Sequence, residues 1–179
     1  MAPTEIAGVY PAAHWNSAAT AVGALTALLE SDGTPSAASV TWDSGGVWQL
    51  PVPDAPGDTR MMTGYLDPRT TSLVVVSDLP QALTATGYDV YVYANGEVPA
   101  AVTRAASYAI GAVREVVTQP ALTPFAGTFI PAVNAGFGNY VVFRGVTGAS
   151  FTLTVRPVSG TGLRAPVNGL QIVTAGAAP

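Results

Sequence analysis

The chain has 179 residues, of which 49% are hydrophobic and only 10% are charged, and its net charge is −4. It contains no cysteine and no lysine, so its basic side chains are seven arginines. This composition excludes disulfides, cysteine-ligated zinc and a thiol nucleophile, and it argues against nucleic acid or an anionic membrane surface as a partner, because both require a basic protein surface.

The first part of the chain has a mixed pattern. Residues 6–16 combine proline, glycine and aromatic side chains, which predicts an irregular segment that wraps a sheet. Within residues 18–30 the apolar side chains stand at helical spacing, but threonine, valine and glycine interrupt them. We favour a strand over residues 24–30 that pairs with residues 39–42, with a helix as the alternative.

Two further strands are predicted before the middle of the chain, at residues 47–50 and 70–77. The second contains an apolar run, Leu-Val-Val-Val, and we expect it to be buried. Between them lies an irregular stretch, residues 51–68, which is long for a loop within one domain. Loops of this length are commonly functional or packed by their own side chains.

The segment 87–96 organises the prediction, because it is rich in β-branched and aromatic residues in strict alternation. Successive side chains of a strand point to opposite faces. The two predicted faces are Tyr88, Val90, Val92 and Asp89, Tyr91, Tyr93. We expect the valine face to pack in the core and Asn95-Gly96 to form a tight turn.

The rest of the chain continues as short apolar segments separated by glycine and proline. The predicted strands are residues 104–110, 114–118, 125–129, 139–143, 150–155 and 167–173. No helix is predicted. Nine to eleven short strands with turns between them predict an all-β fold, an antiparallel β-sandwich with jelly-roll character. Residues 1–173 are expected to form one domain, and residues 174–179 a linker-like tail.

Several segments resemble galactose-binding-like and malectin-like β-sandwiches. Residues 164–173 (RAPVNGLQIV) are similar to the closing strand of those domains, residues 89–93 (DVYVY) to a central strand, and residues 138–143 with 151–155 to the hairpin before the closing strand. The resemblance spans roughly residues 42–173. The whole chain also resembles β-sandwich modules of large bacterial secreted polysaccharide-degrading proteins. The resemblance implies a jelly-roll fold and carbohydrate binding through aromatic side chains and a carboxylate. It also implies a secreted or cell-surface location within a larger multidomain protein.

The aromatic strand face is the first candidate site. Sugars lay their apolar ring faces on aromatic side chains while carboxylates and amides bind their hydroxyl groups. The candidate ligand-binding residues are Tyr91, Tyr93, Asp89, Tyr65, Arg60 and Trp48. The competing interpretation is structural: a tyrosine packs beneath a loop, and Asp89 pairs with an arginine across the sheet.

The loop from Asp54 to Asp67 is the second candidate, because oxygen-rich loops can bind calcium. It lacks the spacing of an EF-hand. The alternative is turn chemistry with an ion pair, Asp58–Arg60 or Asp67–Arg69. A structural calcium therefore stands only as an option, and no other cofactor is expected.

No catalytic motif occurs. The chain has one histidine, His14, no Gly-x-Ser-x-Gly sequence, and four glutamates that fall in no motif. A hydrolase built around His14 ranks last. We predict a non-catalytic carbohydrate-binding module for a neutral oligo- or polysaccharide. The alternative is a structural, adhesion or spacer module of a secreted or surface protein without a small ligand.

Overall fold

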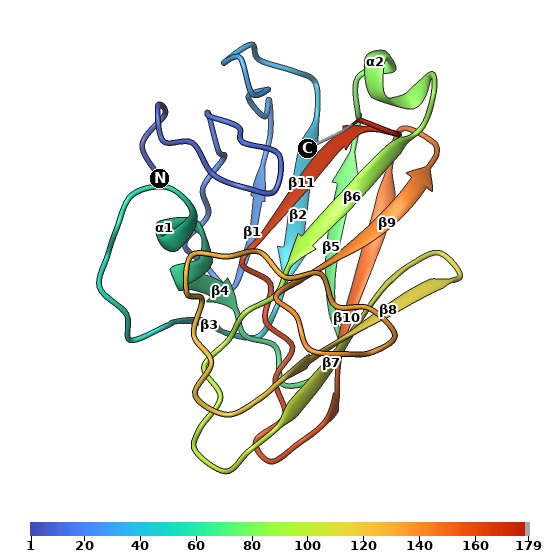
Figure 1. The fold of residues 1–179 in the computed structure, drawn as a ribbon. Helices are drawn as coiled ribbons and strands as arrows, with labels where there is room; N and C mark the ends of the chain where they lie inside the picture. Colours follow the sequence, from blue (N-terminus) through green and yellow to red (C-terminus); the bar gives the residue numbers. More distant parts are fainter. Residues whose placement is uncertain (178–179) are drawn as a thin grey trace.

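The computed structural model describes residues 1–177, and they form an all-β sandwich of antiparallel sheets (Figure 1). The larger sheet has the order β1 (Val22–Leu25), β2 (Ser39–Asp43), β5 (Ser72–Ser77), β10 (Phe151–Ser159), β7 (Arg104–Ile110), β8 (Val113–Gln119). The smaller sheet has the order β11 (Gly169–Thr174), β6 (Tyr88–Tyr93), β9 (Tyr140–Val146). A ribbon of β3 (Val47–Gln49) and β4 (Gly64–Leu66) lies beside them.

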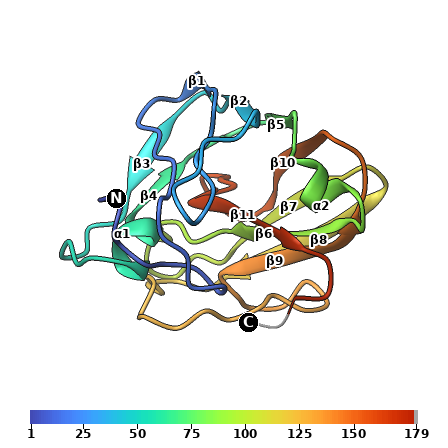
Figure 2. The same ribbon diagram turned by 90° about the horizontal axis from the view of Figure 1, so that it is seen from above.

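The chain crosses repeatedly between the two sheets. It leaves the larger sheet after β5, returns after β6, and crosses again on either side of β9 and after β10. Figure 2 shows the larger sheet curving around the smaller one. The predicted antiparallel sandwich is therefore confirmed, whereas its jelly-roll character and its galactose-binding-like relationship stay predictions.

The core lies between the sheets and contains the expected face of β6. Tyr88, Val90 and Val92 are fully buried there, and they pack with Leu153 and Val155 of β10. Valine and tyrosine suit this position because their side chains fill a pleated, enclosed surface. Strand β5 departs from the prediction of a wholly buried run, since it alternates: Val74 and Val76 enter the core, but Leu73 is 44% exposed.

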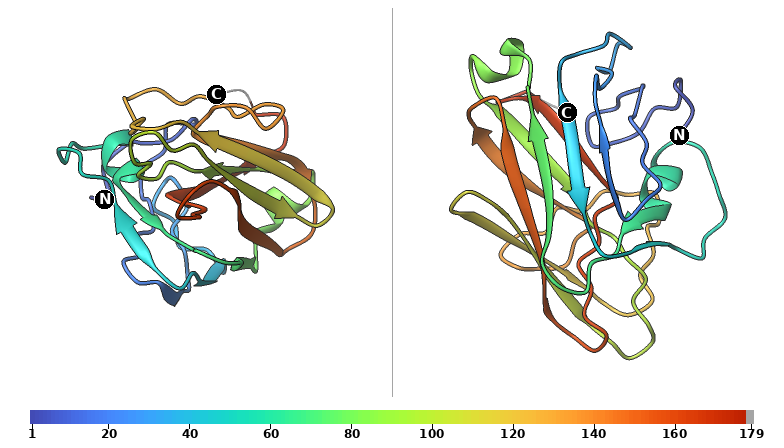
Figure 3. Two further views of the ribbon diagram at one scale, coloured as in Figure 1. Left: turned by 90° about the horizontal axis from the view of Figure 1, so that it is seen from below. Right: turned by 180° about the vertical axis from the view of Figure 1, so that it is seen from behind.

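A second, smaller core covers the outer face of β6. Its buried members are Ala7, Met61, Met62, Tyr91, Tyr93 and Phe125. They come from the N-terminal segment (residues 1–16), from α1 (Asp58–Thr63), from β6 and from the loop after β8. Strand β6 is consequently buried along its whole length, on both faces. The two views of Figure 3 show the N-terminal segment and α1 on one side of the sandwich.

Several local predictions need correction. Residues 18–30 contain strand β1, so the helical alternative is wrong, and β1 pairs with β2 as expected but begins and ends earlier than predicted. Residues 51–68 hold helix α1 and strand β4, and α2 (Gln81–Thr84) is a second short helix. Residues 125–129 form no strand; their two phenylalanine rings pack against each other at a tilt, and Phe129 contacts Tyr93.

The predicted tight turn at Asn95-Gly96 is also wrong. Gly96 does not have a positive φ. A glycine is needed there for space instead, because a Cβ atom at this position would lie 3.0 Å from Cγ of Pro166.

The end of the chain stays attached to the sandwich as far as it is described. The main-chain N–H of Ala175 donates to the carbonyl of Gly87 at 3.1 Å. The linker-like tail predicted at residues 174–179 therefore begins inside β11, and residues 178 and 179 lie outside the described part of the chain. Neither helix of residues 1–177 is long and apolar enough to cross a membrane.

Leu153 is fully buried at the centre of the core between the two sheets. Leu153→Ala should lower the free energy of unfolding by about 2–5 kcal/mol, because it leaves a cavity that the sheets cannot close. Denaturant unfolding monitored by tryptophan fluorescence measures the change. Leu73→Ala, the same substitution on the neighbouring strand at an exposed site, should cost far less, and equal losses would contradict this description of the core.

Candidate functional site

The tyrosine face of β6 is closed. Asp89, Tyr91 and Tyr93 share this face as predicted, but their exposed fractions are 2%, 3% and 0%. The N-terminal segment lies over them, and the ring of Trp15 packs edge-on against Tyr93 with centroids 6.1 Å apart. The expectation that these side chains form an open sugar-binding surface is therefore wrong, because a second core covers them.

Hydrogen bonds attach this cover to the sheet. The main-chain N–H of Val9 donates to Oη of Tyr93 at 2.7 Å, and the same hydroxyl donates to Oε1 of Gln171 at 2.7 Å. Gln171 in turn exchanges hydrogen bonds with the main chain of Tyr10. Burial raises the pKa of Tyr93 well above its usual value, so its hydroxyl stays protonated and able to donate.

Asp89 is satisfied within the sheet. Its Oδ2 lies 2.9 Å from Nη1 of Arg144, and its Oδ1 accepts the main-chain N–H of Gly145 at 2.8 Å. Arg144 belongs to β9, the neighbour of β6, so the structural interpretation of Asp89 is confirmed. Both carboxylate oxygens are hydrogen-bonded and the side chain is buried, so a ligand that approaches from outside does not reach it.

Arg60 anchors the N-terminal segment to α1. Its guanidinium forms a bidentate pair with Asp54, at 2.8 and 2.9 Å, and a further ion pair with Glu5. The first contact holds the pKa of the Asp54 carboxyl below its usual value. Asp58 instead accepts the main-chain N–H of Gly8 at 2.8 Å, so the predicted pair between Asp58 and Arg60 is wrong.

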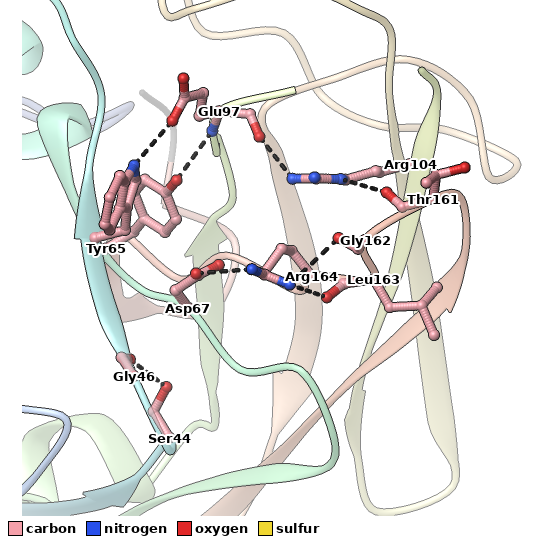
Figure 4. A network of polar contacts seen from close by, with 11 residues as sticks. Ser44, Gly46, Tyr65, Asp67, Glu97, Arg104, Thr161, Gly162, Leu163 and Arg164 are labelled. Atoms are coloured by element: carbon pink, nitrogen blue, oxygen red, sulfur yellow. Dashed lines mark hydrogen bonds and ion pairs between the residues drawn. The ribbon is translucent and has the colours of Figure 1, made fainter. Parts of the chain in front are cut away.

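Asp67 also has a different partner from the predicted one. Its Oδ2 pairs with Nε of Arg164 at 2.8 Å, not with Arg69 (Figure 4). The carboxylates of the 54–67 loop thus point to separate partners. Within residues 1–177, no three carboxylate or histidine side chains converge as ligands of a metal ion would.

A large cleft opens between the two sheets on the side of β1 and β11. Its volume is about 1510 Å³, and β11, β1, β2, β5, the N-terminal segment and the β3–β4 ribbon contribute to its walls. The aromatic side chains that line it are Tyr10, Trp15, Trp42, Trp48 and Tyr65. This cleft is a concave surface that the described residues offer to a ligand.

Trp48 and its neighbours form a polar-aromatic surface at this cleft. The Trp48 side chain is 57% exposed, and its Nε1 donates to Oε2 of Glu97 at 2.8 Å. Tyr65 lies directly opposite Trp48 in the ribbon, and its Oη accepts the main-chain N–H of Glu97 at 3.1 Å (Figure 4). Burial raises the pKa of Tyr65 to about 12. We call Trp48, Tyr65 and Glu97 the Trp48 platform.

A network behind the platform fixes it in place. Nη1 of Arg104 donates to the main-chain carbonyl of Glu97 at 2.7 Å, and its Nε donates to the carbonyl of Thr161. Arg164 links Asp67 to the carbonyl of Leu163 in the same loop (Figure 4). These contacts join the loops after β4, β6 and β10 with strand β7, so the platform rests on the body of the sandwich.

The six residues predicted to bind a ligand therefore lie in three different regions of the structure. Tyr91, Tyr93 and Asp89 lie under the N-terminal segment. Arg60 holds that segment by its ion pair with Glu5 and lies on the cleft wall, and Trp48 and Tyr65 pair across the β3–β4 ribbon at the cleft. Sequence reasoning missed Glu97, which had no motif to mark it. Its place just after a strand that runs through the sheet was the one available signal, since ligand-binding side chains concentrate at strand ends.

His14 lies elsewhere on the cleft wall, with its ring against Gly33. Within residues 1–177, the hydrogen bonds of the serine and aspartate side chains go to groups other than His14. Nothing in this geometry assembles a catalytic triad around it.

Comparison of the chain with protein-family models, with curated proteins and with solved structures finds no match. The resemblance to galactose-binding-like and malectin-like domains accordingly stays a prediction.

The buried hydroxyl of Tyr93 generates the prediction for this region. Tyr93→Phe should lower the free energy of unfolding by about 1–3 kcal/mol, because it leaves the Val9 N–H and Gln171 without their buried partner. Tyr140→Phe is the control, since within residues 1–177 Tyr140 is the one tyrosine whose hydroxyl makes no hydrogen bond. That control should stay within about 0.5 kcal/mol of the unsubstituted protein. Both variants are measured by thermal and by denaturant unfolding. Equal losses of stability in Tyr93→Phe and Tyr140→Phe would show that the hydroxyl of Tyr93 does not attach the N-terminal segment.

Proposed function

We propose that this protein is a non-catalytic module that binds a neutral oligo- or polysaccharide at the Trp48 platform. The observation that carries the proposal is the exposed indole of Trp48, held by its Nε1 hydrogen bond to Glu97 at the edge of a cleft. The proposal moves the predicted stacking surface from the tyrosine face of β6 to the β3–β4 ribbon.

The chemistry of the platform suits a sugar. A pyranose ring presents an apolar face of C–H groups, and a large exposed indole can accept it by stacking. The indole is already fixed by Glu97, so less side-chain entropy is lost on binding than for a freely rotating ring. The Glu97 carboxylate stands beside it and can accept hydrogen bonds from hydroxyl groups.

The charge of the surroundings supports a neutral ligand. Arg104 and Arg164 are held by main-chain carbonyls and by Asp67, so neither guanidinium is presented alone to an anionic sugar. A secreted or cell-surface location, in a larger multidomain protein of bacterial origin, belongs to the same proposal and rests on the resemblance of the sequence to such modules.

Affinity electrophoresis against plant and microbial polysaccharides, followed by calorimetry with oligosaccharides, tests the proposal. Trp48→Ala should weaken binding by about tenfold or more, because it removes the stacking surface. Val47→Ala changes the exposed neighbour on the same strand and should leave binding unchanged. Tyr93→Phe should also leave the affinity unchanged, because its ring lies under the N-terminal segment. Binding to no glycan, or an affinity that does not depend on Trp48, would overturn the proposal.

A structural or assembly role is the second candidate, favoured by a different observation. Between β8 and β9, four large apolar side chains are each more than half exposed: Leu122, Ile130, Val133 and Phe137. Exposed apolar side chains that gather in one segment are typical of surfaces that contact another protein.

Light scattering over a range of concentrations tests the assembly role. A second copy that docks on this segment should raise the average mass with concentration, and Phe137→Ser should reduce that increase because it removes apolar contact area. Val158→Ser, at an exposed position of β10 outside the segment, is the control. A constant monomer mass at every concentration would rule out self-assembly.

A further inference from the structure

Strand β11 has one unpaired edge. It pairs with β6 alone, as the outermost strand of the smaller sheet. The main-chain N–H of Ala175 donates to the carbonyl of Gly87, and this hydrogen bond continues the pairing of β11 with β6. In an antiparallel strand, alternate residues direct their main-chain N–H and C=O groups to opposite sides. Gly169, Gln171 and Val173 therefore bond to β6, while Leu170 and Ile172 turn two N–H and two C=O groups away from it.

Those four groups have no partner in the described chain. Among residues 1–177, no hydrogen bond reaches the main-chain N–H or C=O of Leu170 or Ile172 from the side away from β6. The N-terminal segment, which bonds to the side chain of Gln171, covers the outer face of β11 but does not pair with its edge. An unpaired strand edge of this kind is a template for another strand.

The unpaired edge runs along the cleft. All six residues of β11 line it, and the opposite wall is apolar: Leu25, Leu28, Val40, Trp42, Val74, Val76. The side chains of Leu170 and Ile172 pack against the main core, so a strand added beside them would send alternate side chains between the two sheets. Figure 2 shows β11 as the strand of the smaller sheet on the side of β1 and β2.

The charge and size of the cleft define the occupant. Its charged lining residues are Glu30, Arg60 and Glu97, together with the amino terminus, and none of them belongs to β1, β2, β5 or β11. The volume of about 1510 Å³ exceeds the roughly 300–1,000 Å³ of typical small-molecule pockets. Six residues of strand span roughly 20 Å. An uncharged, extended segment matches this wall better than a compact ligand does.

We propose that the cleft binds an extended, uncharged peptide segment of a partner protein, which adds as a fourth strand to the β11 edge. Its main chain pairs with Leu170 and Ile172, and its alternate apolar side chains lie over the partly exposed Leu25, Leu28 and Val40. This is recognition by strand addition, in which the main chain supplies affinity and the alternate side chains supply specificity. The site lies on a different wall of the cleft from the Trp48 platform, so it goes beyond the proposed carbohydrate binding.

Hydrogen exchange followed by NMR tests the edge itself. In the free protein the amides of Leu170 and Ile172 should exchange much faster than those of Gln171 and Val173, because only the latter pair with β6. An acetylated and amidated octapeptide of alternating valine and serine serves as the probe. Its binding should slow the exchange of Leu170 and Ile172 at least tenfold. If these amides are equally slow in the free protein, the edge is already paired and the proposal fails.

Two N-methylated forms of the probe give the sharpest control. Methylation of one set of alternate amides removes the donors that face β11, and methylation of the other set removes only donors that face away. One form should therefore lose at least tenfold in affinity while the other keeps it. Loss in both forms or in neither would overturn pairing with the edge, whatever the behaviour of any protein variant.

A protein variant separates this site from the platform. Leu170→Pro removes an N–H that faces away from β6, and proline is tolerated at such positions of edge strands. It should lose peptide binding and keep glycan binding, whereas Trp48→Ala should do the reverse. If Leu170→Pro does not fold, the two N-methylated peptides decide.

Two other occupants would give different results. Displacement of the probe by dodecanoate, without slower exchange at Leu170 and Ile172, would overturn the proposal in favour of a small apolar ligand. Slower exchange of the same amides on raising the protein concentration alone would assign the edge to a second copy of this chain.

Discussion

Strand β6 is enclosed on both faces, and the remaining structure follows from how this enclosure is achieved. Its valine face packs against the larger sheet, and its tyrosine face packs under the N-terminal segment. The hydroxyl of Tyr93 stabilises the second contact because it pairs with the main chain of Val9 and with Gln171 on the adjacent strand. A phenol suits this position, since its ring is apolar and its single hydroxyl satisfies two buried groups.

The cleft beside β11 follows from the unequal widths of the two sheets. The N-terminal segment lies over the outer face of the smaller sheet, and this sheet has only three strands against six in the larger one. The larger sheet therefore extends past β11 to β2 and β1, and the cleft occupies the space where a further strand of the smaller sheet would lie. Because the smaller sheet has fewer strands, its unpaired edge at β11 and the apolar inner face of β1, β2 and β5 border the same cleft.

Charged side chains mainly attach loops to this framework. Arg60 joins Glu5 and Asp54, Arg164 joins Asp67 to the loop after β10, and Arg144 pairs with Asp89. The two surfaces proposed for recognition offer an exposed indole with the carboxylate that it hydrogen-bonds, at the Trp48 platform, and unpaired main-chain groups, at the β11 edge. That inventory suits neutral partners, and it accounts for why both proposed ligands are uncharged.

The sequence by itself determined the fold class, most of the strands and the core face of β6, because alternation and turn residues act over a few neighbouring positions. It also determined that Asp89, Tyr91 and Tyr93 share a face. Only the tertiary structure decided what covers that face. The residues that bury it, such as Val9 and Phe125, are distant in the chain, and their own local pattern indicates nothing about the surface they contact. The cleft and the β11 edge were likewise invisible, since they arise from the unequal widths of two sheets whose strands are interleaved along the chain.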